Sequence, residues 1–243
     1  MTQIIAFALV NGFSLLLGAA CGVYSRWEQR TIAAFMAFGA GALICALTFG
    51  LMDEAFLSGG FDAVIIGFLA GGLIYIGSDY LVHYLGGRKH KRHQFKITPR
   101  EPSGFMITLG SMLDGIPESI ALGITLFAQP NIGLMMLAAI AISNFPEGVA
   151  SASGLKKAGF KPGKIFVTWL AASLFITLIT IFSYLFLHDL SPNTIGILES
   201  LAAGAILAML AANMMPEAYE EGGFTISALT VFGFLVAFVV SRL

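Results

Sequence analysis

Long apolar stretches alternate with short polar connections along most of this chain. Eight of them are long enough to cross about 30 Å of hydrocarbon as helices. Of the 243 residues, 57% are hydrophobic and only 11% are charged, which lies outside the range of soluble domains. The pattern predicts an all-α polytopic membrane protein in which residues 1–243 form a single transmembrane domain. The predicted spans are 4–23, 32–52, 63–85, 104–128, 132–155, 164–187, 194–215 and 224–241.

Basic residues are concentrated in three of the connections. Two arginines lie in the first connection, six basic residues lie in the loop 86–103, and four lysines lie in the connection after the fifth span. Together they account for 12 of the 13 Lys and Arg residues, and only Arg242 lies elsewhere. Because cytoplasmic connections are enriched in Lys and Arg, we expect these three connections to face the cytoplasm. Both termini are then expected on the outer side of the cell (inner) membrane.

The second and seventh spans carry an internal repeat. Residues 41–61 align without gaps to residues 204–224, an offset of 163, and nine of the 21 positions are identical. The two copies are five crossings apart, so they run in opposite directions through the membrane. Inverted repeats of this kind build alternating-access transporters, whose sites lie near the middle of the bilayer. The expected plan is therefore 3+2+3, in which helices 1–3 and 6–8 are inverted repeats and helices 4 and 5 form a central pair.

Each central span contains a glutamate directly after a proline, in the sequences Asp114-Gly-Ile-Pro-Glu118 and Ser143-Asn-Phe-Pro-Glu147. The spacing of four residues places Asp114 on the same helical face as Glu118, and Ser143 on the same face as Glu147. Each charged side chain at this depth costs roughly 2.5 to 3.5 kcal/mol, unless a divalent cation or protons offset it. Each proline also removes one main-chain hydrogen bond and is expected to kink its helix, which exposes a carbonyl oxygen. The motifs predict an ion path between the two central helices.

At these motifs the chain resembles the ZIP (Zrt/Irt-like) family of divalent metal transporters. The fourth span of that family carries His-Asn-x-Pro-Glu-Gly, and its fifth carries His/Gln-x-x-Pro-Glu-Gly. The seventh span resembles the family as well, in Ala203-Gly-Ala-Ile-Leu followed by Met215-Pro-Glu-Ala. The resemblance implies transport of zinc or a related ion (Fe, Mn or Cd) toward the cytoplasm, a homodimer in membrane lipid, no permanently bound cofactor and no nucleic-acid partner.

The resemblance also implies a ligand set. It maps a primary metal position to Asp114, Glu118, Ser143 and Glu147, and a degraded second position to Glu118, Asn144, Glu147 and Asn213, because Gly115 has no side chain there. Asp114 and Ser143 replace family histidine or glutamine, so we expect one bound metal rather than two. Oxygen ligands favour harder ions such as Mn²⁺ or Fe²⁺, although carboxylates also bind Zn²⁺.

Three further pairs of residues have both a structural and a functional interpretation. Asp79 and His83 stand one helical turn apart near the inner end of the third span, as a structural pair or as ligands for metal release. His90 and His93 lie in the basic loop, which either docks metal or only sets the orientation in the membrane. Glu54 and Glu217 occupy equivalent repeat positions at opposite membrane faces, either in capping and surface roles or as candidate outer and inner way stations for the ion.

Three other functions compete with transport. An intramembrane protease would need His-Glu-x-x-His or a Gly-x-Gly-Asp motif, and the sequence contains neither, so we expect no enzyme. A passive divalent cation channel is consistent with the same carboxylates. A non-transporting metal sensor derived from the family is favoured by the missing histidines.

Overall fold

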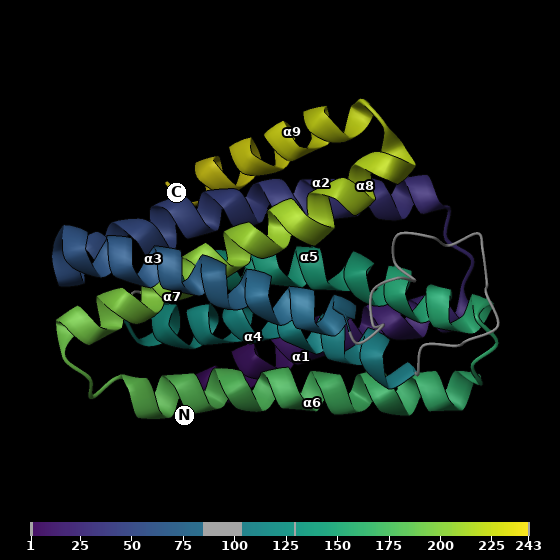
Figure 1. The fold of residues 1–243 in the computed structure, drawn as a ribbon, viewed down its shortest axis with the longest axis horizontal. Helices are drawn as coiled ribbons and strands as arrows, with labels where there is room; N and C mark the ends of the chain where they lie inside the picture. The colour runs from purple at the N-terminus through teal and green to yellow at the C-terminus, as the bar shows by residue number, and fades with distance from the viewer. Residues whose placement is uncertain (1, 85–103, 129, 243) are drawn as a thin grey trace.

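Helices form all the regular structure in the part of the chain that the computed structural model describes, which is residues 2–84, 104–128 and 130–242 (Figure 1). The all-helical prediction is confirmed for these residues. Two short segments, η1 and η2, are π-helical. The elements are α1 (Thr2–Tyr24), α2 (Gln29–Ala46), η1 (Leu47–Met52), α3 (Asp53–Tyr84), α4 (Gly104–Ala128), α5 (Pro130–Lys157), α6 (Pro162–Leu187), α7 (Pro192–Met209), η2 (Leu210–Met214), α8 (Met215–Gly222) and α9 (Thr225–Val240).

Length and composition identify five helical stretches in the described residues as candidate membrane spans, which shows an integral membrane protein. One of them, Gln29–Val82, contains 54 residues. At 1.5 Å per residue it would be about 81 Å long, far more than one crossing needs. Figure 1 shows that this stretch reverses its direction: α2 runs toward one end of the molecule, and α3 runs back from that end. The count of eight spans stays a prediction.

The segment 53–62 differs from the expectation. The predicted spans 32–52 and 63–85 left this segment as the connection between them, but α3 already begins at Asp53 and is interrupted only at Gly60. Gly60 has φ 68° and ψ −168°, a backbone conformation that glycine adopts without the steric cost that a Cβ would bring. The turn is therefore concentrated at one glycine, and helical hydrogen bonding continues on both sides of it.

The two copies of the sequence repeat share irregular backbone features. The π-helix η1 begins at Leu47 and η2 begins at Leu210, and 210 − 47 = 163, which is the offset of the repeat. Gly60 and Gly223 both have positive φ, 68° and 62°, and again 223 − 60 = 163. π-Helical turns are rare, so their recurrence at one offset indicates that the two copies are related in structure as well as in sequence.

The helices pack in two groups. In one group α1 packs on α5 and α6, and α4 packs on α5 and α6; in the other, α3 packs on α7 and α2 packs on α8 and α9. The groups meet where α2 lies against α5 and where α4 lies against α7. The two helices that carry the Pro-Glu motifs therefore belong to one group and line its boundary with the other.

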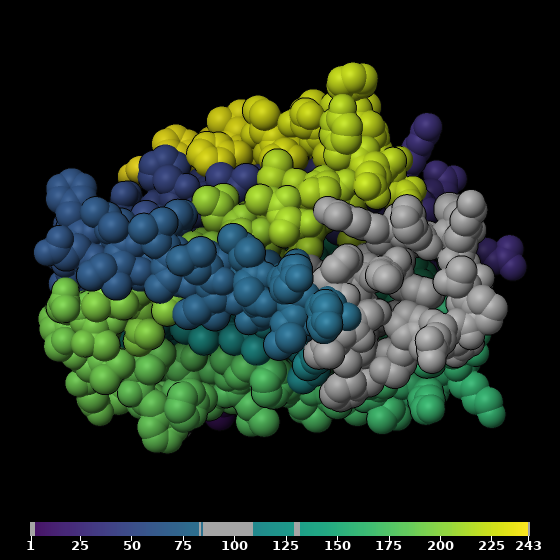
Figure 2. Space-filling view, viewed as in Figure 1, coloured from purple at the N-terminus to yellow at the C-terminus, as the bar shows by residue number. Residues whose placement is uncertain are grey.

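Large apolar side chains cover the outward faces of α3 and α6, which lie across the middle and the lower part of the view in Figure 2. Leu73 is 69% exposed and Leu178 is 64% exposed. Soluble monomers rarely expose apolar patches of this extent, whereas a lipid-facing surface requires them. Other exposed apolar residues on these faces are Ile65, Ile66, Leu69, Ile74, Val167, Leu174, Phe182 and Phe186.

Candidate metal site

Five of the six predicted site residues lie on α4 and α5, which pack against each other. Asp114 and Glu118 belong to α4, whereas Ser143, Asn144 and Glu147 belong to α5. The first four are at most 3% exposed, and Glu147 is half-buried. The sixth, Asn213, is half-buried in the π-helix η2. The fold thus places these polar groups inside an otherwise apolar interior.

Glu118 and Ser143 join the two central helices directly. The Ser143 hydroxyl lies 3.5 Å from Oε1 of Glu118 and 2.9 Å from the carbonyl oxygen of Ile140, so its one hydrogen is shared between two acceptors. The other carboxylate oxygen of Glu118, Oε2, has no hydrogen-bond partner among the described residues. The charges of Glu147 and Asp114 lie close enough to act on Glu118. A buried anion with one oxygen lacking a donor is suited to accept a cation.

Residues of the other helix group hydrogen-bond to Asp114. Its Oδ1 accepts a hydrogen bond from the Tyr75 hydroxyl of α3 and lies 3.4 Å from the amide nitrogen of Asn213. Asn213 also donates to the oxygen of Tyr75, which is 2% exposed. These bonds link α4 to α3 and to η2 across the boundary between the two groups. The sequence analysis missed Tyr75; the available signal was its position one helical turn before Asp79.

A residue of α1 hydrogen-bonds to Asn144. Its amide nitrogen donates to Oδ1 of Asn11, 3.1 Å away, and both residues are at most 2% exposed. Sequence reasoning missed Asn11 as well. The signal that could have found it is the presence of one asparagine in the middle of the apolar stretch 4–23, because a buried amide in a membrane helix requires partners.

The three acidic side chains are near one another but do not form a closed ligand shell. Within the ranges that the structure describes, no three His, Cys, Asp or Glu side chains are grouped closely enough to hold a metal ion. Like charges repel, and Asp114 is already bonded to Tyr75 and Asn213. Closing a ligand shell around a cation would therefore require side-chain movement in this region.

The helices α4 and α5 continue through Pro117 and Pro146. Kinks of α4 and α5 at these prolines, and carbonyl oxygens exposed by them, therefore stay predictions. The departures from α-helical geometry that the structure shows near the site are instead the π-helical turns η1 and η2, and Asn213 belongs to η2. π-Helical turns occur frequently at functional sites.

Four of the other predicted residues belong to described helices, three to α3 and one to α8. Asp79, Glu54 and Glu217 are half-buried. His83 belongs to α3, while His90 and His93 lie outside the described residues. Glu199 is fully buried in α7, and neither of its carboxylate oxygens has a hydrogen-bond partner in the described parts of the chain.

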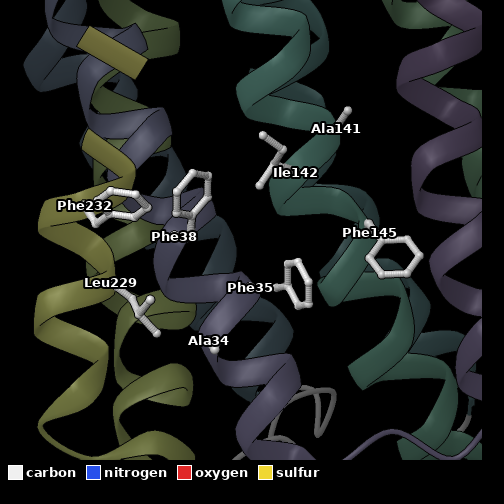
Figure 3. Close-up of a pocket in the computed structure, with 8 residues that line it drawn as sticks. All are labelled: Ala34, Phe35, Phe38, Ala141, Ile142, Phe145, Leu229 and Phe232. Carbon is white, nitrogen blue, oxygen red and sulfur yellow. The ribbon is translucent and has the colours of Figure 1, made fainter. Parts of the chain in front are cut away.

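A cavity of about 620 Å³ lies among α2, α5 and α9 (Figure 3). The labelled side chains are alanine, leucine, isoleucine and phenylalanine, and Phe35 projects from α2 toward α5. None of these side chains can ligate a cation, so this cavity is not the metal site.

The comparisons with known proteins agree with the motifs. A family model described as "ZIP Zinc transporter" matches residues 81–241, about two thirds of the chain. The chain belongs to the ZIP zinc transporter family. This ZIP chain is also 24% identical, over 225 residues, to an Arabidopsis thaliana protein named "Putative zinc transporter". The aligned region is 91% of this chain and 35% of that relative, so the chain spans about a third of the relative's length. Family membership supports metal transport in general and leaves the individual ligands as a prediction.

Proposed function

We propose that this ZIP chain carries zinc or a related divalent ion (Fe, Mn or Cd) toward the cytoplasm through a carboxylate site between α4 and α5. The observation that carries the proposal is Glu118, which is 2% exposed in an apolar helical interior, with Oε2 lacking a donor among the described residues. An isolated carboxylate in such surroundings is unfavourable. A divalent cation bound between Glu118 and Glu147 would offset that cost.

Each ligand has a distinct part in the proposed site. Glu118 and Glu147 supply anionic oxygens from the two central helices, and Ser143 supplies a hydroxyl that already contacts Glu118. Asn144 and Asn213 supply neutral amide oxygens, which complete the coordination without adding charge. Asp114 supplies the third carboxylate, and its Oδ1 is bonded to Tyr75 and Asn213 from the neighbouring helix group. The set is composed of oxygen ligands, which bind Mn²⁺ and Fe²⁺ well and Zn²⁺ acceptably.

The proposed architecture is eight spans in the 3+2+3 plan, with alternating access between the two sides of the membrane. Two observations support it: the π-helical turns and the positive-φ glycines recur at the repeat offset of 163, and the site lies at the boundary of two helix groups. A boundary between two packed groups can open toward either side of the membrane. We further propose both termini outside the inner membrane and a homodimer in lipid.

Uptake into proteoliposomes tests the function. The wild-type chain should accumulate metal from outside, and uptake should saturate with metal concentration. Glu118→Ala and Glu147→Ala should each abolish uptake and leave membrane insertion intact, because each removes an anionic ligand. The matched control is Glu220→Ala, which removes an exposed glutamate of α8 and should transport normally. Normal uptake by both central variants would refute the proposed site.

The same assay separates the alternatives. A channel would conduct much faster than a carrier and would not saturate in the same concentration range. A sensor would bind metal and give no uptake above that of empty liposomes. Competition among Zn²⁺, Mn²⁺, Fe²⁺ and Cd²⁺ then identifies the preferred ion.

A further inference from the structure

We propose that Asn11 of α1 is a positioning residue for the metal site: it fixes the orientation of the Asn144 amide so that the oxygen, and not the nitrogen, is available to the metal. This inference rests on the proposed function, because it assumes that Asn144 is a ligand. Asn11 itself does not touch the metal; it acts through Asn144.

Four buried side chains from four helices form a continuous chain of hydrogen bonds. The amide nitrogen of Asn144 (α5) donates to Oδ1 of Asn11 (α1) over 3.1 Å. The amide nitrogen of Asn11 donates to Oγ of Ser119 (α4) over 3.2 Å and to Oγ1 of Thr180 (α6) over 3.1 Å. Asn11, Ser119 and Thr180 are 0% exposed, and Asn144 is 2% exposed. No bulk solvent reaches these groups, so the orientation of each amide is decided by its protein partners.

The donor and acceptor roles in these hydrogen bonds follow from Thr180, where the series ends. The Thr180 hydroxyl donates its one hydrogen to the carbonyl oxygen of Ile176, 3.1 Å away, and a carbonyl can only accept. Oγ1 of Thr180 must therefore accept its other hydrogen bond, and the NH₂ group of Asn11 provides it. With its NH₂ group directed at Thr180 and Ser119, Asn11 presents its oxygen to Asn144. Asn144 must therefore donate from its own NH₂ group to this oxygen. Its Oδ1 then stays available to the metal.

If the Asn144 amide were turned over, its oxygen would face the oxygen of Asn11 with no hydrogen between them, and a buried acceptor without a donor is unfavourable. The turned amide would also direct an NH₂ group, which cannot bind a cation, toward the metal. The hydrogen bonds thus select the one amide orientation that is compatible with coordination. Ser119 follows Glu118 directly, so Asn11 contacts both central helices beside their Pro-Glu motifs.

A double-mutant cycle on the purified full-length chain tests this role. The variants are Asn11→Leu, which keeps the approximate size of the side chain, Asn144→Ala, and the two combined. The measured quantity is the dissociation constant for Zn²⁺ or Mn²⁺ in detergent. Because loss of a residue that orients a ligand typically weakens metal binding by about 10- to 100-fold, Asn11→Leu should weaken it at least about tenfold. The double variant should bind no more weakly than Asn144→Ala alone.

Two further variants separate orientation from general packing. Thr180→Val removes the acceptor that orients Asn11 and should weaken binding, whereas Thr180→Ser keeps the hydroxyl and should bind normally. The matched control is Thr177→Val, because Thr177 also connects α6 to α1, through the carbonyl oxygen of Ala8 at 3.2 Å, but not to Asn144. It should leave the affinity unchanged.

The results that overturn the proposal differ from those that overturn the function. If the wild-type chain binds metal but the effects of Asn11→Leu and Asn144→Ala multiply, or Thr177→Val weakens binding as much as Thr180→Val does, Asn11 has only a packing role. A wild-type chain that binds none of the ions would overturn the metal site itself, and this inference with it.

Discussion

Replacing Glu118 by glutamine should change metal affinity and stability in opposite directions. Glutamine keeps the size of the side chain and one oxygen near Ser143, but it removes the negative charge. In the metal-free protein the Glu118 carboxyl group is buried near the acidic side chains of Glu147 and Asp114, and one of its oxygens accepts no hydrogen bond from a described group. Glu118→Gln should therefore stabilise the metal-free chain and impair metal binding.

The size of each effect follows from the burial of Glu118, which is 2% exposed. A buried carboxylate in the centre of a membrane helix costs roughly 2.5 to 3.5 kcal/mol, and an incompletely bonded amide costs about 1 to 3 kcal/mol. The difference favours glutamine by about 1 kcal/mol in the metal-free state. Loss of an anionic ligand should weaken binding about 100-fold, which corresponds to ~2.8 kcal/mol.

Two measurements on the same purified protein check this prediction: thermal unfolding without metal, and the dissociation constant for Zn²⁺ or Mn²⁺. Glu220→Gln is the control, because Glu220 is exposed in α8 and neither quantity should change. A purely structural role for Glu118 predicts a lower unfolding temperature instead. Wild-type metal affinity in Glu118→Gln would refute the reasoning directly.

Three other substitutions are informative. Asp114→His introduces a nitrogen ligand and should shift preference from Mn²⁺ toward Zn²⁺; identical competition profiles for variant and parent would exclude Asp114 from the ligand set. Tyr75→Phe removes the hydroxyl that donates to Asp114 and should lower the free energy of unfolding by about 1.5 to 3 kcal/mol. The control is Tyr80→Phe, which should have little effect in the same unfolding assay because the Tyr80 side chain is 67% exposed. Glu199→Gln should unfold at the same or a higher temperature, because the buried Glu199 carboxylate has no hydrogen-bond partner among the described residues; a clear loss of stability would indicate a bonding role.

Local properties of the sequence were enough to predict the helices, the membrane environment and the family. A membrane-spanning segment must satisfy its own backbone hydrogen bonds, so apolar length alone indicates a helix. The Pro-Glu motifs are likewise local, because residues four apart share a face of one helix. For this reason the pairing of Asp114 with Glu118 could be predicted without any knowledge of how the helices pack.

The contacts between helices came only from the tertiary structure. Asn11 and Asn144 are 133 residues apart in the chain, and Tyr75 reaches Asp114 from a different helix group. No periodicity connects such positions, because each contact depends on how two helices are rotated and placed against each other. An apolar stretch has a similar composition whichever of its faces is buried. The sequence by itself therefore determined the helices and which polar residues are candidates for the metal site, while packing decided which side chains hold those candidates in place.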